Sequence, residues 1–211
     1  MNVPEVTVPE LAVQAMIFDA DGVIVRPKSW FVTPAAERYG IPRDQFMSFI
    51  HGEFQRCISG ELELAKVLPP LLEQWRVTVS ADAFIRAWLE HEHAIDTNLL
   101  RGIQRIRATG LKCYLGTNQE ENRAQYMKHD MGLEAALDGV FFSSELKAKK
   151  PDPRFYERVQ ALLDLPASSI LLWDDSPANV AAALKASWQA KLYTTFEQFE
   201  SQLLQYTRAA Q

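Results

Sequence analysis

The chain is poor in cysteine, has no long apolar run and carries no surplus of positive charge. Two cysteines among 211 residues cannot form a disulfide framework or a cysteine-rich metal site, which favours a reducing compartment. No apolar run approaches the roughly 20 residues that a membrane-spanning helix needs. A net charge of −5 argues against a general binder of nucleic acid or anionic membranes. We therefore expect a soluble, cytoplasmic protein with neither a nucleic-acid nor a membrane partner.

The two ends of the chain carry little signal. Residues 1–6 lack the basic start and the apolar stretch of a secretory signal, and residues 196–211 predict a terminal amphipathic helix that frays. The composition, 47% hydrophobic and 23% charged, is that of an ordinary globular protein. At this length we expect one large core, or one core with a smaller insertion, in a monomer or a homodimer.

Five short apolar runs are each followed by polar residues. They lie at residues 15–18, 113–116, 139–142, 170–173 and, more weakly, 190–193. Such runs are typical of buried strands of a parallel sheet that end in loops. Apolar residues at helical spacing fill the segments between the later runs. The alternation predicts an α/β fold with a doubly wound parallel sheet.

The stretch from residue 27 to residue 96 interrupts this alternation. It has helical patterns and few strand signals, and prolines, Pro69 and Pro70 among them, punctuate it. We interpret it as a small helical cap, with residues 1–26 and 97–211 forming the catalytic core. An insertion that leaves a loop beside a site is well placed to act as a lid. The alternative is a helical layer packed rigidly on the core.

Polar side chains follow four of the predicted strands, at the sheet edge where ligands of doubly wound folds bind. Taken singly, such features are more often turns or solvated surface. Their coincidence on four strand ends predicts a site that handles phosphoryl groups. In chain order they are Asp19 and Asp21, Thr117 and Asn118, the lysines at 147, 149 and 150, and Asp174 with Asp175.

The four aspartates predict a divalent cation. Asp19 and Asp21, one residue apart after a buried strand, repel each other, and a cation between them would relieve the repulsion. Asp174 and Asp175, after another predicted strand, would add two more negative charges at the same place. Carboxylate oxygens together with a phosphate are the ligands that suit Mg²⁺. One lysine and Mg²⁺ would still leave one negative charge, so we expect the pocket to depend on its metal.

A lysine and a threonine are the candidates to bind phosphate. Lys147, Lys149 and Lys150 are all possible, but Lys150 directly precedes Pro151, which restricts its backbone. A fixed ammonium could neutralise phosphate oxygens and keep a nearby aspartate ionised. Thr117 offers a hydroxyl and adjacent backbone N–H groups at the start of a helix.

In this order and spacing, the motifs resemble those of the haloacid dehalogenase superfamily, in its phosphatase-like branch with a helical cap after the first motif. Residues 18–23 resemble the first motif, residues 116–118 the second, residues 150–153 the third and residues 174–179 the fourth. The resemblance spans nearly the whole chain and implies a Rossmann-like core.

The resemblance also implies roles for single residues. Asp19 would be the nucleophile that forms an aspartyl-phosphate, and Asp21 the general acid and then base. Thr117, Asn118 and Lys150 would bind the phosphoryl group. Mg²⁺ would be held by Asp19, the backbone carbonyl of Asp21 and Asp175. Asp174 would either bind the metal as well or support the residues that bind it.

These residues lead us to expect a Mg²⁺-dependent hydrolase of small phosphorylated metabolites, with sugar phosphates as candidates. An acid at Asp21 favours phosphate esters over carbon–halogen bonds, because a halide leaves without a proton. One alternative is a phosphotransferase or sugar-phosphate mutase that uses the same intermediate. Another is a non-catalytic phosphate-binding module.

Overall fold

The computed structural model describes residues 13–207, so the predictions for residues 1–6 and for the end of the chain beyond residue 207 lie outside the described residues. Within that range, no helix has the length and apolar character to cross a membrane. Five strands form one parallel sheet in the order β3-β2-β1-β4-β5. The strands are β1 (Ala15–Phe18), β2 (Lys112–Thr117), β3 (Gly139–Phe142), β4 (Ile170–Asp174) and β5 (Gln189–Leu192).

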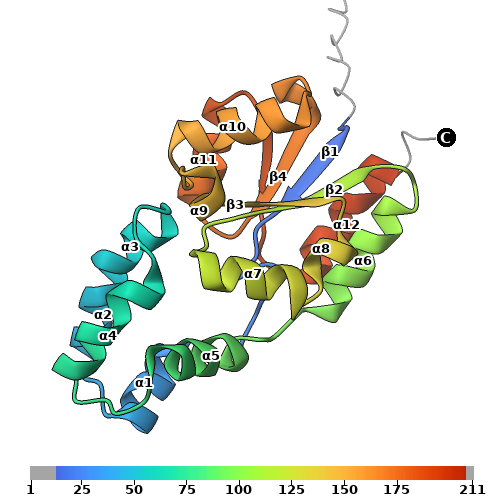
Figure 1. Ribbon diagram of the computed structural model, residues 1–211. Coiled ribbons are helices and arrows are strands. Elements are labelled where there is room, and N and C mark those ends of the chain that lie inside the picture. The colour runs from blue at the N-terminus through green and yellow to red at the C-terminus, as the bar shows by residue number, and fades with distance from the viewer. Residues whose placement is uncertain (1–12, 208–211) are drawn as a thin grey trace, which may run out of the picture.

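Helices cover both faces of this sheet (Figure 1). One face carries α6 (Thr97–Arg107), α7 (Glu121–His129), α8 (Leu133–Ala136) and α12 (Phe196–Thr207). The other carries α10 (Pro153–Leu163), α11 (Pro177–Lys185) and the short η1 (Ala167–Ser169), while α9 (Ser143–Leu146) follows β3 directly. The predicted doubly wound parallel sheet is therefore confirmed.

Alternate side chains of each central strand enter different cores. Met16 and Phe18 pack under α6 and α12, whereas Ile17 between them packs under α10. Because side chains of a strand alternate between faces, a strand covered on both sides must be apolar throughout. This explains why the central strands are continuous apolar runs in the sequence.

A third apolar core belongs to the helices between β1 and α6. Phe31, Phe46, Phe84 and Trp88 lie at its centre, and the rings of Phe31 and Trp88 stack with centroids 5.4 Å apart. These helices form a separate group beside the sheet (Figure 1). They are α1 (Val32–Tyr39), α2 (Arg43–His51), α3 (Glu53–Ile58), α4 (Leu64–Gln74) and α5 (Ala81–His91).

Pro69 and Pro70, two of the prolines that punctuate this stretch of the sequence, lie inside α4 and do not end it. Each proline removes one backbone hydrogen bond to the residue four positions earlier. Those earlier residues, Ala65 and Lys66, are exposed, as are both prolines. Water can therefore satisfy the freed carbonyl groups, while Leu64, Leu68 and Leu72 bury the opposite face of the helix.

The two segments that connect the helical group to the sheet run side by side. Val25 and Ile95 form an antiparallel bridge, flanked by backbone hydrogen bonds of 2.8 Å from Arg26 N to Ala94 O and from Asp96 N to Ile24 O. A second connection joins the helical group to the core, where three side chains of the core donate hydrogen bonds to α3 and to the turn after it. These contacts are Ser143 Oγ to Ile58 O, Lys147 Nζ to Gly60 O and Lys149 Nζ to Gln55 Oε1, each 2.7 Å.

We expect Asp138→Asn to destabilise the sheet, because Asp138 joins three elements. It accepts hydrogen bonds from Arg107 (2.7 Å), Lys112 (3.1 Å) and the backbone N–H of Cys113 (3.0 Å). Partial burial alone would raise the pKa of Asp138, but these donors together lower it to about 2. The loss should be about 1–2 kcal/mol at neutral pH, as measured by urea unfolding.

The sign of the pH dependence follows from the lowered pKa. The contribution of Asp138 is complete above the unfolded pKa of 3.8 and is lost as the pH falls toward about 2. The difference in unfolding free energy between wild type and Asp138→Asn should therefore narrow from pH 5 to pH 3. A difference that stays constant over this range would contradict the assignment.

Candidate active site

The predicted catalytic aspartate Asp19 is buried at the carboxyl end of β1. Its side chain accepts a 2.7 Å hydrogen bond from the backbone N–H of Ala20, and Lys150 Nζ lies 3.1 Å from the same oxygen. The hydroxyl of Thr117, at the end of β2, also hydrogen-bonds to Asp19. Three segments that are distant in sequence therefore meet at this carboxylate.

Of the three candidate lysines, Lys150 alone lies among the aspartates. Its side chain is fully buried, and Nζ is 2.5 Å from Asp174 Oδ2 as well as 3.1 Å from Asp19. Lys147 and Lys149 extend instead toward the turn after α3 and toward α3 itself. The sequence argument from Pro151 thus selected the lysine that the fold brings to the carboxylates.

Asn118, a predicted phosphate ligand, uses its side chain to hold Lys150. Its Nδ2 donates to the carbonyl of Lys150, and its Oδ1 accepts from the backbone N–H of Lys150, both at 2.8 Å. A two-point clamp of this kind fixes the backbone from which the Lys150 ammonium projects. The role predicted for Asn118 in phosphate binding stays a prediction.

Asp174 and Asp175 stand in contrasting surroundings. Asp174 is fully buried and accepts from Lys150, from Asn179 Nδ2 at 3.0 and 3.1 Å and from the backbone N–H of Ser176 at 2.9 Å. Asp175 is exposed. One carboxylate oxygen each of Asp19, Asp174 and Asp175 lies within 4.8 Å of the others, which is close enough for a shared cation.

The electrostatics of this cluster fit a divalent cation. Burial raises the pKa of Asp19 to about 7; Lys150 and Thr117 oppose the rise, and Asp174 and Asp21 add to it. Burial alone would lower the pKa of Lys150, but Asp19 and Asp174 raise it above its ordinary value. Burial and Asp174 also raise the pKa of Asp175. A nearby cation would restore the ionised carboxylates, so the residues present fit Mg²⁺.

The carboxylate of Asp21 is held by Arg123 of α7 and by Gln119, whose Nε2 also lies 3.4 Å from the Thr117 hydroxyl beside Asp19. Its Oδ1 accepts from Arg123 Nη2 at 2.7 Å, and its Oδ2 accepts from Gln119 Nε2 at 2.9 Å. Arg123 also contacts Glu92, at the end of α5. Sequence reasoning missed these three partners. Gln119 and Arg123 closely follow the Thr117-Asn118 motif, whereas no pattern in the sequence links Glu92 to the site.

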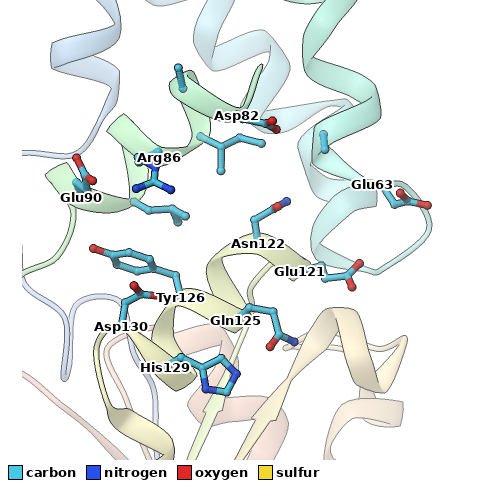
Figure 2. Close-up of a pocket in the computed structure, with 14 residues that line it drawn as sticks. Glu63, Asp82, Arg86, Glu90, Glu121, Asn122, Gln125, Tyr126, His129 and Asp130 are labelled. Carbon is cyan, nitrogen blue, oxygen red and sulfur yellow. The ribbon is translucent and has the colours of Figure 1, made fainter. Parts of the chain in front are cut away.

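A wide hollow among the described residues lies elsewhere, between α5 and α7. It is an open groove of about 860 Å³, lined by Asp82, Arg86, Glu121, Tyr126 and other residues of α4, α5 and α7 (Figure 2). None of the predicted site residues lines it. A cavity of only about 10 Å³ lies closer to the site, between Trp88, Arg123 and their neighbours.

The fold and the site together define a class of α/β enzymes that bind their ligand at the carboxyl edge of a parallel sheet, beside an inserted group of helices. The model of the haloacid dehalogenase-like hydrolases matches residues 13–187. The chain therefore belongs to this family of hydrolases.

Individual relatives agree with this assignment. The phosphorylated carbohydrates phosphatase of Thermotoga maritima is 26% identical over 183 residues, which make up 82% of this chain and 81% of that protein. A HAD family enzyme of Bacteroides thetaiotaomicron shares the fold with a TM-score of 0.80 at 17% identity, over 91% of this chain and 98% of its own. That enzyme has also been solved in complex with magnesium and inorganic phosphate.

A dehalogenase is also among the structural relatives. The L-2-haloacid dehalogenase of Xanthobacter autotrophicus matches with a TM-score of 0.61 at 18% identity, over 92% of this chain and 83% of its own. At these identities the likenesses establish the fold and not the reaction. The choice between chemistries must come from the residues of this chain.

We expect Gly22→Ala to weaken Mg²⁺ binding. Gly22 has a φ of +80°, and a Cβ there would lie 2.0 Å from Asp175 Oδ2, so the carboxylate would have to move. Displacing this predicted metal ligand should reduce Mg²⁺ affinity by about 10-fold or more, measured by calorimetric titration.

Gly110→Ala is the matched control. Gly110 has a φ of +95°, and nothing lies within 4 Å of where its Cβ would be, so it shares the backbone strain without the collision. Equal Mg²⁺ affinities in the two variants would show that the contact between Gly22 and Asp175 does not matter.

Proposed function

We propose that this chain is a Mg²⁺-dependent phosphomonoesterase that acts on small phosphorylated metabolites, with sugar phosphates as the first candidates. The observation that carries the proposal is the buried ammonium of Lys150 beside the carboxylate of Asp19, with the Thr117 hydroxyl on the same carboxylate. The name of the Thermotoga maritima relative, a phosphatase of phosphorylated carbohydrates, supports the substrate class.

Asp19 would attack the phosphorus of the substrate and form an aspartyl-phosphate, which splits one difficult displacement into two. Negative charge spreads over the equatorial phosphoryl oxygens in the transition state. Lys150 and the hydroxyl of Thr117, which both contact Asp19, are close enough to stabilise that charge. Mg²⁺, when bound, would supply further charge neutralisation at the same oxygens.

Asp21 would protonate the oxygen that leaves and then activate water for the second displacement. Its presence supports phosphate-ester chemistry over dehalogenation, since a halide needs no proton. Its carboxylate is half-exposed and is held by Arg123 and Gln119. As the family resemblance implies, the backbone carbonyl of Asp21, and not its side chain, is the group proposed to hold Mg²⁺.

The proposed metal ligands are therefore Asp19, the Asp21 carbonyl and Asp175. We assign Asp174 to a different task, because Lys150, Asn179 and Ser176 already occupy both of its oxygens. Asp174 would fix the ammonium of Lys150 in front of the substrate. The exposed Asp175 remains free to turn toward a cation.

Residues 27–96 would act as a lid over this site. The contacts of α3 with Ser143, Lys147 and Lys149 fasten the helical group to the core near the carboxyl ends of the strands. Substrate entry would involve an opening of these contacts, and closure would favour small substrates over proteins.

The proposed setting is the cytoplasm. Both cysteines, Cys57 and Cys113, are free and buried, as expected for a protein that does not rely on disulfides. Whether the chain is a monomer or a homodimer stays a prediction.

The deciding experiment is a metabolite screen for phosphate release with Mg²⁺, and we expect Asp19→Asn to abolish turnover of every substrate found. Product analysis separates the alternatives, because a phosphotransferase or mutase would yield a new phosphorylated product instead of inorganic phosphate. Retention of wild-type turnover by Asp19→Asn would disprove the proposed nucleophile.

A lysine pair provides an internal comparison. Lys150→Met should lower kcat by at least about 100-fold, since it removes the cation that faces the phosphoryl group. Lys147→Met, three residues away, loses only the contact with Gly60 and should keep most of the activity. Similar losses in both variants, measured at saturating substrate, would mean that Lys150 has no special role.

Mg²⁺ should also stabilise the fold. The folded chain gathers Asp19 and Asp175 around one point, and the unfolded chain does not. At 100 times its dissociation constant, Mg²⁺ should add about 2.7 kcal/mol and raise the melting temperature. Asp175→Asn should reduce this shift, and an unchanged melting curve for wild type would argue against the metal site.

A further inference from the structure

Arg123 contacts two carboxylates and has no role in the mechanism proposed above. Its guanidinium, 8% exposed, sits on the first turn of α7 and reaches two carboxylates at once. Nη2 lies 2.7 Å from Asp21 Oδ1, and Nη1 donates to Glu92 Oε2. Both terminal nitrogens of Arg123 are thus paired with carboxylates of the chain.

Glu92 connects this fork to both ends of the helical insertion. It directly follows α5, and its Oε1 accepts a 2.9 Å hydrogen bond from the backbone N–H of Phe31, the residue that precedes α1. Its side chain is 5% exposed. The carboxylate of Asp21 is thus tied through Arg123 to the entrance and the exit of the helical group.

Stability alone does not account for such an arrangement. Burying an arginine and a glutamate costs desolvation that their attraction repays only with good geometry, and apolar replacements are often at least as stable. What a planar fork supplies is orientation, because it fixes the position of each carboxylate relative to the other. With Gln119, two residues before α7, on its second oxygen, Asp21 has both oxygens held from α7 and the segment that precedes it.

We propose that Arg123 is a positioning residue for Asp21, and that Glu92 anchors Arg123 while the lid is closed. This inference rests on the proposed phosphatase function and extends it. In the first step a bond forms between Asp19 and phosphorus and the bond from phosphorus to the ester oxygen breaks. That oxygen takes a proton that the half-exposed carboxyl group of Asp21 has first gained from water, so Asp21 must face it. Arg123 would supply this orientation.

The test compares two leaving groups. p-Nitrophenolate leaves readily without a proton, whereas the alkoxide of a sugar phosphate does not, so only the sugar phosphate depends strongly on the acid. Arg123→Gln should lower kcat/KM for a sugar phosphate from the screen by about 100-fold or more, and for p-nitrophenyl phosphate by less than about 10-fold. Arg123→Lys, which cannot span both carboxylates, should restore only part of the loss.

Three further variants make the result decisive. Arg123→Met combined with Glu92→Met leaves no unpaired buried charge, so it tests the proposal even if Arg123→Gln folds poorly, and it should show the same split. Adding Arg123→Gln to Asp21→Asn should cause little further loss. Arg105→Gln, which breaks only the exposed pair with Glu200, is the matched control and should change neither substrate.

Equal losses on both substrates, or no loss on either, would overturn the positioning role and leave Arg123 as a structural tie. If Asp19→Asn abolishes phosphate release but the Arg123 variants show no split, this inference alone fails. If wild type releases phosphate from neither substrate, the proposed function fails and the role of Arg123 falls with it.

Discussion

The site is organised around one buried ammonium group. The side chain of Lys150 lies between Asp19 and Asp174 with no exposure to water. Burying these charges costs desolvation free energy, which their attraction offsets only if every partner is held in place. Asn118 clamps its backbone, and Asn179 and Ser176 fix Asp174. The parallel sheet makes this possible, because it ends β1, β2 and β4 at one edge.

A second charged group, Arg123, organises the surroundings of Asp21. The two clusters differ in what they join: Lys150 connects residues of the core, whereas Arg123 connects the core to the helical insertion. Asp19 and Asp21 are only two residues apart, yet Asp19 pairs with Lys150 and Asp21 pairs with Arg123. The short loop after β1 therefore brings one carboxylate to each of these two charged groups.

Much of this could be predicted from the sequence, because the information is local. The runs at residues 15–18 and 139–142 coincide with β1 and β3, and no bound of the other three strands differs by more than one residue. Strands of a covered parallel sheet are apolar, which makes them visible in the sequence. The pairing of Asp21 with Arg123 and Glu92 could not be predicted, since it depends on how α5 docks against α7. The position of Pro69 and Pro70 inside a helix could not be predicted either, because a helix tolerates proline only where the freed carbonyl groups are exposed to water, and the sequence does not state exposure.

The paired linkers at Val25 and Ile95 have a consequence for how such proteins diversify. Because the chain leaves and re-enters the core through two adjacent segments, a different inserted domain could replace the helical group without breaking the hydrogen bonds of the sheet. Substrate selectivity could then change while the residues at the carboxyl edge of the sheet stay the same.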